Sequence, residues 1–181
     1  MKPNVIFDRA QIQHRVAQLA DHISRDYRGR DIVLVGLLKG CVPFIADLGA
    51  QLEFIKESGD GVGDVYLDYM IVSSYHDKHE PGALRLERDI EFPVKGMHVI
   101  VVDDVADTCN TLAWVVNHLG KKEPASLRLC VCVSKPDKHR HEVQLDYVGF
   151  SQAGLPFLAG YGMDDAKKYR LMPDIFEVLP K

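Results

Sequence analysis

The sequence lacks several features that would assign it quickly to a functional class. It has no apolar run near the roughly 20 residues needed to cross a bilayer, and its first four residues, Met1-Lys2-Pro3-Asn4, lack the apolar core of a signal peptide. Basic residues are not in excess, since Lys and Arg total 22 against 26 Asp and Glu, a net charge of −4. We therefore expect a cytoplasmic protein whose partners include no nucleic acid and no membrane.

Paired metal-binding and nucleotide-binding fingerprints are also missing. The four cysteines lie in or beside apolar runs without the C-x-x-C spacing of a zinc site, so we expect reduced thiols. Neither G-x-G-x-x-G nor G-x-x-x-x-G-K-[ST] occurs, which removes the usual dinucleotide and P-loop fingerprints. The cysteines are Cys41, Cys109, Cys130 and Cys132.

What the sequence does contain is typical of one globular domain. Its 181 residues are enough for one substantial core, and 46% hydrophobic with 27% charged residues is an ordinary balance. Several apolar runs are nearly unbroken, which predicts strands buried on both faces of a sheet. These strands are expected at residues 32–38, 98–102 and 127–133, with shorter ones at 65–72, 147–150 and 157–159.

Helices are predicted between these strands from apolar residues at helical spacing. The first begins in a capping box at Asp8 and Gln11 and ends at Gly29; the second has Pro43 near its start, and the third ends at Gly120. Strands alternating with helices predict an α/β fold with a mainly parallel, twisted sheet flanked by helices. Residues 73–82 are polar and lack periodicity, so we expect a mobile loop there.

An acidic and hydroxyl-rich stretch, residues 103–111, follows the second long apolar run and leads into a helix. Ligands of open parallel sheets bind beyond the carboxyl ends of strands, and helix N-termini favour anions such as phosphate. Thr108 and Thr111 add hydroxyl donors, whereas the carboxylates of Asp103 and Asp104 suit sugar hydroxyls or a divalent cation. A phosphorylated sugar would satisfy both halves. Taken alone, the acids are equally consistent with solvated charges at a helix terminus.

Residues 98–112 resemble the phosphoribosyl-diphosphate-binding motif of type I phosphoribosyltransferases. Further segments resemble the hypoxanthine (6-oxopurine) branch of that family, and they follow its order over about residues 8–176. These segments are Leu34-Val35-Gly36-Leu37-Leu38-Lys39-Gly40, Ser73-Ser74-Tyr75, Tyr147-Val148-Gly149-Phe150 and Phe157-Leu158-Ala159-Gly160-Tyr161-Gly162-Met163-Asp164.

The resemblance implies the type I phosphoribosyltransferase fold and a purine salvage activity. The expected reaction is Mg²⁺-dependent transfer of the 5-phosphoribosyl group from phosphoribosyl diphosphate to hypoxanthine or guanine, giving IMP or GMP and pyrophosphate. A homodimer or homotetramer is expected. The family's organisation implies one domain over residues 1–181, with a small hood from about 1–20 and 147–181 and a mobile lid at 73–84.

The resemblance also implies roles for the sugar-binding and base-binding residues. Asp103 and Asp104 would hold the ribose hydroxyls directly or through Mg²⁺, and Asp107 would be the general base near purine N7. The 5′-phosphate would lie against the loop formed by Asp107, Thr108, Cys109, Asn110 and Thr111. Lys135 would donate to the 6-oxo group, Phe157 would stack on the base, and the backbone of Leu158 would meet the purine edge.

Pyrophosphate and lid roles follow from the same resemblance. Leu38, Lys39 and Gly40 match the pyrophosphate loop that contains a non-proline cis peptide, and Ser74 and Tyr75 match the start of the lid. Asp164 matches a ligand of a second Mg²⁺ ion and Arg170 a pyrophosphate contact. The alternative is that Arg170 simply pairs with Asp164 or Asp165.

The sequence departs from the family pattern at three places. Cys109 replaces a glycine of the phosphate loop; we expect the loop to keep its shape, with weaker phosphate binding and a lowered thiol pKa that makes oxidation easier. His76 replaces a glycine after the lid Ser-Tyr pair. Residues 151–156 lack the usual Ile-Pro-Asp and are one residue longer, a change that could shift base selectivity.

A regulator that senses nucleotides without catalysis is the rival interpretation. Such relatives tend to lose base or lid residues or to gain a basic surface, whereas this chain keeps Asp107, Lys135, Ser74-Tyr75 and Asp164 and is net acidic. The enzyme is therefore favoured. Its preference among hypoxanthine, guanine and xanthine is not readable from the sequence, because the family contacts the purine 2-position largely through backbone.

Overall fold

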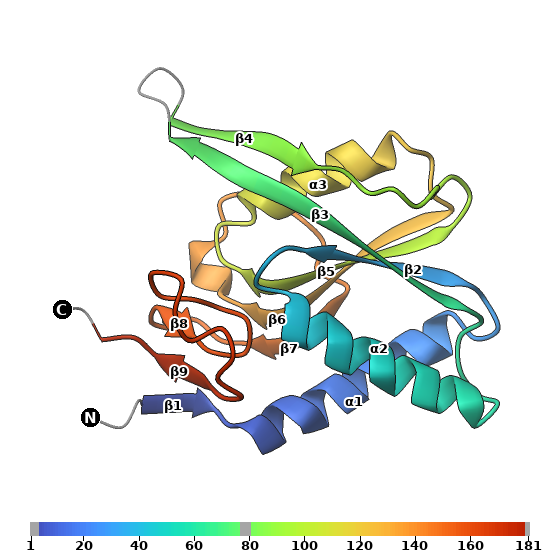
Figure 1. The fold of residues 1–181 in the computed structure, drawn as a ribbon, viewed down its shortest axis with the longest axis horizontal. Coiled ribbons are helices and arrows are strands. Elements are labelled where there is room, and N and C mark those ends of the chain that lie inside the picture. The colour runs from blue at the N-terminus through green and yellow to red at the C-terminus, as the bar shows by residue number, and fades with distance from the viewer. Residues whose placement is uncertain (1–3, 77–80, 180–181) are drawn as a thin grey trace.

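A computed structural model describes residues 4–76 and 81–179, and its centre is a twisted, mostly parallel sheet with helices on both faces (Figure 1). The described strands of this sheet follow the order β4-β3-β2-β5-β6-β7, and only β4 runs antiparallel to its neighbour. The α/β fold predicted from the sequence is confirmed. The strands are β2 (Ile32–Leu37), β3 (Val65–His76), β4 (Pro81–Arg88), β5 (His98–Ala106), β6 (Ser126–Ser134) and β7 (Tyr147–Ser151).

The two faces of the sheet support two separate cores. Alternate residues of a strand point to opposite faces, so Ile32 and Leu34 of β2 pack with helices α1 (Arg9–Asp26) and α2 (Val42–Glu57), while Val33 and Val35 pack on the side of α3 (Asn110–Gly120). All six residues of β2 are buried. This burial on both faces explains why β2 reads as an unbroken apolar run.

The first helix starts where its capping box predicts. Asp8 Oδ1 accepts from the Gln11 backbone N–H at 2.9 Å, and Gln11 Oε1 accepts from the Asp8 backbone N–H at 2.9 Å. Its end differs from the prediction, because the helix stops at Asp26 and Gly29 lies in the following turn with φ +67°. Among residues 4–76 and 81–179, no helix has the length and apolarity that crossing a membrane requires.

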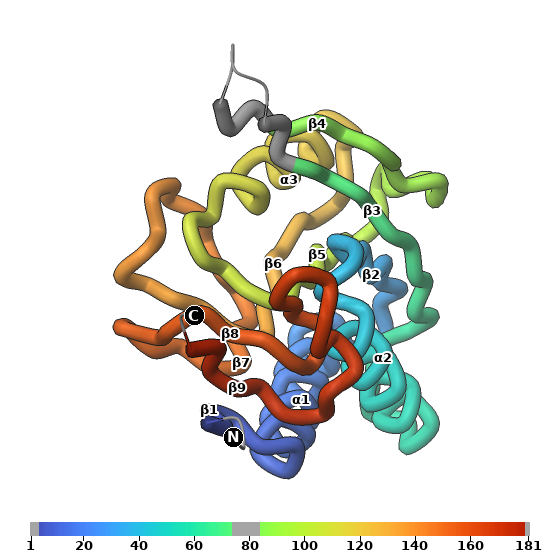
Figure 2. Tube along the Cα trace, turned by 60° about the vertical axis from the view of Figure 1, so that its left-hand side comes forward, coloured from blue at the N-terminus to red at the C-terminus, as the bar shows by residue number. Residues whose placement is uncertain are grey.

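A small second sheet joins the two ends of the chain (Figures 1 and 2). Strand β9 (Ile175–Glu177) pairs antiparallel with both β1 (Asn4–Phe7) and β8 (Leu158–Ala159). Neither β1 nor β9 was predicted, because a strand of three or four residues is too short to show a period.

The loop predicted at residues 73–82 is wrong for its described part. β3 continues to His76 and β4 starts at Pro81, and the two strands pair antiparallel; residues 77–80 lie outside the described part. Backbone hydrogen bonds hold this hairpin, and the edge strand β4 carries polar side chains that suit solvent. Side-chain polarity therefore misled the prediction.

Candidate functional site

The predicted general base and the predicted purine contact lie at the carboxyl ends of two neighbouring strands. Ala106 of β5 and Ser134 of β6 form the last residue pair between these strands. Asp107 directly follows Ala106, and Lys135 directly follows Ser134. Lys135 Nζ lies 3.5 Å from Asp107 Oδ2 and donates to the Pro156 carbonyl at 2.8 Å. Only 3% of Lys135 is exposed, and this burial lowers its pKa although Asp107 opposes the shift. The site thus holds a cation that water barely reaches.

Two adjacent carboxylates precede this pair within β5. Asp103 Oδ1 accepts from the Asp104 backbone N–H at 3.0 Å, and Asp104 Oδ1 accepts from that of Val105 at 2.9 Å. Burial raises the pKa of both groups, and the charge of Asp104 raises the pKa of Asp103 further. A divalent cation or sugar hydroxyls beside the pair would relieve this repulsion, so these carboxylates fit Mg²⁺.

The phosphate loop turns sharply into α3 through Cys109. This residue has φ +62° and ψ 8°, a left-handed conformation that explains why glycine is favoured at this position. The side chain of the N-cap residue Cys109 makes no capping hydrogen bond, and the Asn110 backbone N–H makes only a long contact of 3.5 Å with Thr108 Oγ1, so the first-turn N–H groups suit an anion. The expected lowering of the Cys109 pKa is wrong. Burial, and then the negative charges of Asp107 and Asp103, raise that pKa, so the thiol is not primed for oxidation.

Replacing Cys109 by glycine tests whether the left-handed turn is strained. A left-handed non-glycine residue costs about 1–2 kcal/mol, while the buried side chain of Cys109 contributes about 1 kcal/mol. We expect Cys109→Gly to leave the free energy of unfolding unchanged or slightly raised, and to lower the KM for phosphoribosyl diphosphate. Cys109→Ala is the matched control, because it keeps the strain and loses the packing. A Cys109→Gly variant less stable than Cys109→Ala would refute this account.

The loop after β2 packs directly on the acidic pair. The Leu38–Lys39 peptide is cis, as the resemblance implied. A Cβ on Gly40 would lie 1.9 Å from Asp104 Oδ2, so the backbone of this loop touches the carboxylate. From the C-terminal segment, a Cβ on Gly162 would lie 1.8 Å from the Gly40 carbonyl. Figure 2 shows this segment beside the start of α2 and the ends of the central strands.

Gly162 is therefore a residue that side-chain chemistry alone would not single out. It has φ +99° and touches backbone, so an added methyl group can be accommodated only by moving the chain. We expect Gly162→Ala to lower the free energy of unfolding by more than about 1 kcal/mol and to raise the KM for phosphoribosyl diphosphate. Urea unfolding and steady-state kinetics measure the two effects. Gly120→Ala, at an open position in α3, is the control: it should leave KM unchanged and the free energy of unfolding unchanged or slightly raised.

Arg170 and Asp164 come together on the C-terminal segment. Their side chains form an ion pair of 2.5 Å, and Arg170 also donates to the Gly162 carbonyl at 2.6 Å. The pairing considered as the alternative is thus present. Arg170 contacts Gly162, whose backbone lies against that of Gly40, and Asp164 also accepts from the Lys167 backbone N–H at 2.7 Å.

The side of the site predicted for the base is only partly closed. Phe157 is 57% exposed, as a ring available for stacking would be, and Leu158 is buried in β8 opposite Glu177. The Pro156 carbonyl that holds Lys135 was not anticipated, because no residue type signals a backbone acceptor. Ser74 lies on β3, opposite Leu84 of β4; its side chain and that of Tyr75 lie outside the described part.

Comparisons with known proteins find similar chains of one family. The family model of the phosphoribosyl transferase domain matches residues 6–165. The chain is 34% identical over 174 residues to a hypoxanthine-guanine phosphoribosyltransferase of Mycobacterium tuberculosis, covering 92% of this chain and 81% of that protein. It is 34% identical over 180 residues to a hypoxanthine phosphoribosyltransferase of Escherichia coli, covering 97% and 94%.

Solved structures give the same result. A hypoxanthine-guanine phosphoribosyltransferase from Bacillus anthracis superposes with a TM-score of 0.86 at 33% identity, covering 97% of each chain. A hypoxanthine phosphoribosyl transferase of Trypanosoma cruzi superposes with a TM-score of 0.90 at 28% identity, covering 99% of this chain and 94% of that one.

Proposed function

The chain belongs to the phosphoribosyl transferase family, and from its site we propose the following division of labour among its residues. The reaction is the purine salvage step in which the 5-phosphoribosyl group passes from phosphoribosyl diphosphate to hypoxanthine or guanine, giving IMP or GMP and pyrophosphate. The observation that carries this assignment is the buried Lys135 beside Asp107, next to the phosphate loop.

The sugar phosphate is bound by the residues at the end of β5. The N-terminus of α3, with Thr108, Asn110 and Thr111, receives the 5′-phosphate. Asp103 and Asp104 face the ribose hydroxyls. Pyrophosphate leaves toward the Leu38, Lys39 and Gly40 loop and Arg170, where positive charge stabilises the negative charge that develops on it.

The base is activated from the other side. As the anomeric C–O bond breaks, the purine attacks and must lose a proton, which the Asp107 carboxylate accepts near N7. Lys135 stabilises the negative charge that moves onto O6. Phe157 stacks on the ring and the backbone of Leu158 meets its edge. Burial of Lys135 keeps its charge unscreened, which strengthens this interaction.

Mg²⁺ is the cofactor that the acidic pair suits. The repelling carboxylates of Asp103 and Asp104 would hold it, and a bound ion would neutralise charge on the diphosphate. Asp164 would hold a second Mg²⁺ ion, provided that its ion pair with Arg170 opened.

The remaining assignments concern organisation. We infer that the β1–β9–β8 sheet belongs to a hood over the base and that the β3–β4 hairpin belongs to a lid spanning residues 73–84, which shields the cationic ribose from water. The exposed apolar side chains Val42, Phe54 and Leu67 support a homodimer or homotetramer. Four free, buried cysteines suit a reducing, cytoplasmic location.

A steady-state assay with Mg²⁺ and phosphoribosyl diphosphate tests the function directly. Hypoxanthine, guanine, xanthine and adenine are offered in parallel and the nucleotide is detected. We expect turnover with hypoxanthine or guanine and none with adenine, whose 6-amino group cannot accept from Lys135. A folded protein that binds the diphosphate but turns over none of the bases would instead be the nucleotide-sensing regulator.

A further inference from the structure

The hydrogen bonds behind Asp107 involve a residue that has no role in the reaction described so far. The Ala106 carbonyl shares a peptide plane with the Asp107 backbone N–H. That carbonyl accepts from the Lys135 backbone N–H at 2.9 Å and lies 3.3 Å from His139 Nε2. Both contacts come from the segment after β6. They hold the peptide plane from which Asp107 starts.

The His139 ring also contacts β6 itself. Its Nε2 lies 3.3 Å from Ser134 Oγ, and Ser134 is paired with Ala106 across the β5–β6 ladder. A carbonyl oxygen only accepts, so the contact with Ala106 requires Nε2 to carry the proton. Two contacts of equal length then describe one N–H shared between the carbonyl and the hydroxyl. The ring bridges the strand ends that Asp107 and Lys135 follow.

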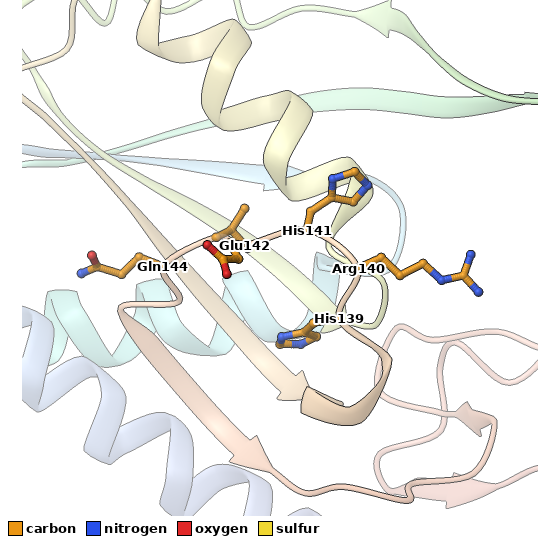
Figure 3. Close-up of a pocket in the computed structure, with 6 residues that line it drawn as sticks. His139, Arg140, His141, Glu142 and Gln144 are labelled. Carbon is orange, nitrogen blue, oxygen red and sulfur yellow. The ribbon is translucent and has the colours of Figure 1, made fainter.

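The neighbouring residue holds the next part of the phosphate loop. The Arg140 backbone N–H donates to the Thr108 carbonyl at 3.0 Å, so the same segment holds the Ala106–Asp107 peptide and the Thr108–Cys109 peptide. Figure 3 shows His139 directed away from Arg140 and His141, beside the end of β6. Residues 139–144 also line an open hollow of about 670 Å³, but their side chains diverge and do not converge on a ligand.

We propose that His139 is a positioning residue for Asp107: its Nε2–H fixes the Ala106–Asp107 peptide and thereby aims the carboxylate at the purine. The proposal rests on the role of Asp107 as general base. A small misorientation of a proton acceptor lowers the rate of the chemical step without removing a substrate contact. Loss of the His139 hydrogen bond should therefore lower kcat and leave the KM for phosphoribosyl diphosphate nearly unchanged.

Single substitutions test the hydrogen bond. We expect His139→Ala to lower kcat about 10-fold with KM within about twofold of wild type. His139→Gln supplies an amide N–H at a similar reach and should restore kcat to within about threefold. His141→Ala is the matched control on the same loop and should behave as wild type. Thermal unfolding of each variant separates positioning from loss of fold.

A double-mutant cycle tests whether His139 acts through Asp107. In an Asp107→Asn background, measured by single turnover with excess enzyme, His139→Ala should change the rate by less than about twofold. If the rate losses caused by Asp107→Asn and His139→Ala multiply in the double variant, the proposal is overturned. A wild-type kcat in His139→Ala would also overturn it. Equal losses in His139→Ala and His139→Gln, with lowered melting temperatures, would assign His139 a purely structural role. Full turnover by Asp107→Asn would remove the base itself, and with it this proposal, while leaving the transferase activity in place.

Discussion

Asp107→Asn is expected to lower kcat by about 10²- to 10⁴-fold, the range over which a positioned general base acts. The substitution keeps the size of the side chain and its place at the end of β5 but removes the proton acceptor. It also removes the negative charge 3.5 Å from Lys135 Nζ. The chemical step is measured with saturating hypoxanthine and phosphoribosyl diphosphate, as the rate of IMP formation.

The Asp107→Asn result needs a measurement of binding beside it. Calorimetric affinity for phosphoribosyl diphosphate should stay within a few-fold of wild type, because we propose that the phosphate loop binds the ligand mainly through the N–H groups of α3. Asp137→Asn, an exposed acid after β6, is the matched control and should retain full kcat. Turnover of Asp107→Asn within about threefold of wild type would show that another group accepts the proton.

The elements of the central sheet were predictable because their physics is local. Burial on both faces makes β2, β5 and β6 unbroken apolar runs, and the capping box marks the start of α1. β1 and β9 were not predictable, because three or four residues form a strand only through a partner far away in the chain. The end of β3 and the start of β4, within residues 73–82, were mistaken for a loop for a related reason: their pairing is made by backbone and not by an apolar pattern.

Only those parts of the site were predictable in which the side-chain type itself indicates the chemistry. Asp103, Asp104 and Asp107 stood out because they follow a buried strand. No local pattern shows that Ala106 pairs with Ser134, which is what brings Lys135 to Asp107. The pKa of Cys109 was predicted with the wrong sign, since the helix terminus was considered and the burial of the thiol beside two carboxylates was not. Desolvation depends on long-range packing, which the sequence does not display.

Lys135→Met is expected to lower kcat/KM for hypoxanthine by about 10²- to 10³-fold, the usual cost of losing one donor to developing negative charge. Methionine has a side chain of similar length and can fill the space of Lys135, which is only 3% exposed, so the surrounding packing should be kept. Lys138→Met, at an exposed lysine of the same turn, is the control and should change kcat/KM little. A Lys135→Met variant within about threefold of wild type would show that O6 is recognised elsewhere.

The pH dependence of activity and stability gives a second test of the role of the charged Lys135 amine. Burial lowers its pKa, so the native state releases this proton at a pH below the ordinary lysine value of 10.5. Activity that needs the charged amine should therefore fall as pH rises through that lowered pKa. In Lys135→Met this part of the fall in activity at alkaline pH should be absent.

The stability of the protein changes in the opposite direction. Between the lowered pKa and 10.5 the unfolded chain binds more protons than the native state, so the free energy of unfolding rises with pH. Urea titrations across that window should show the rise in wild type and its absence in Lys135→Met. A rise that persists in the variant would mean that a different group titrates.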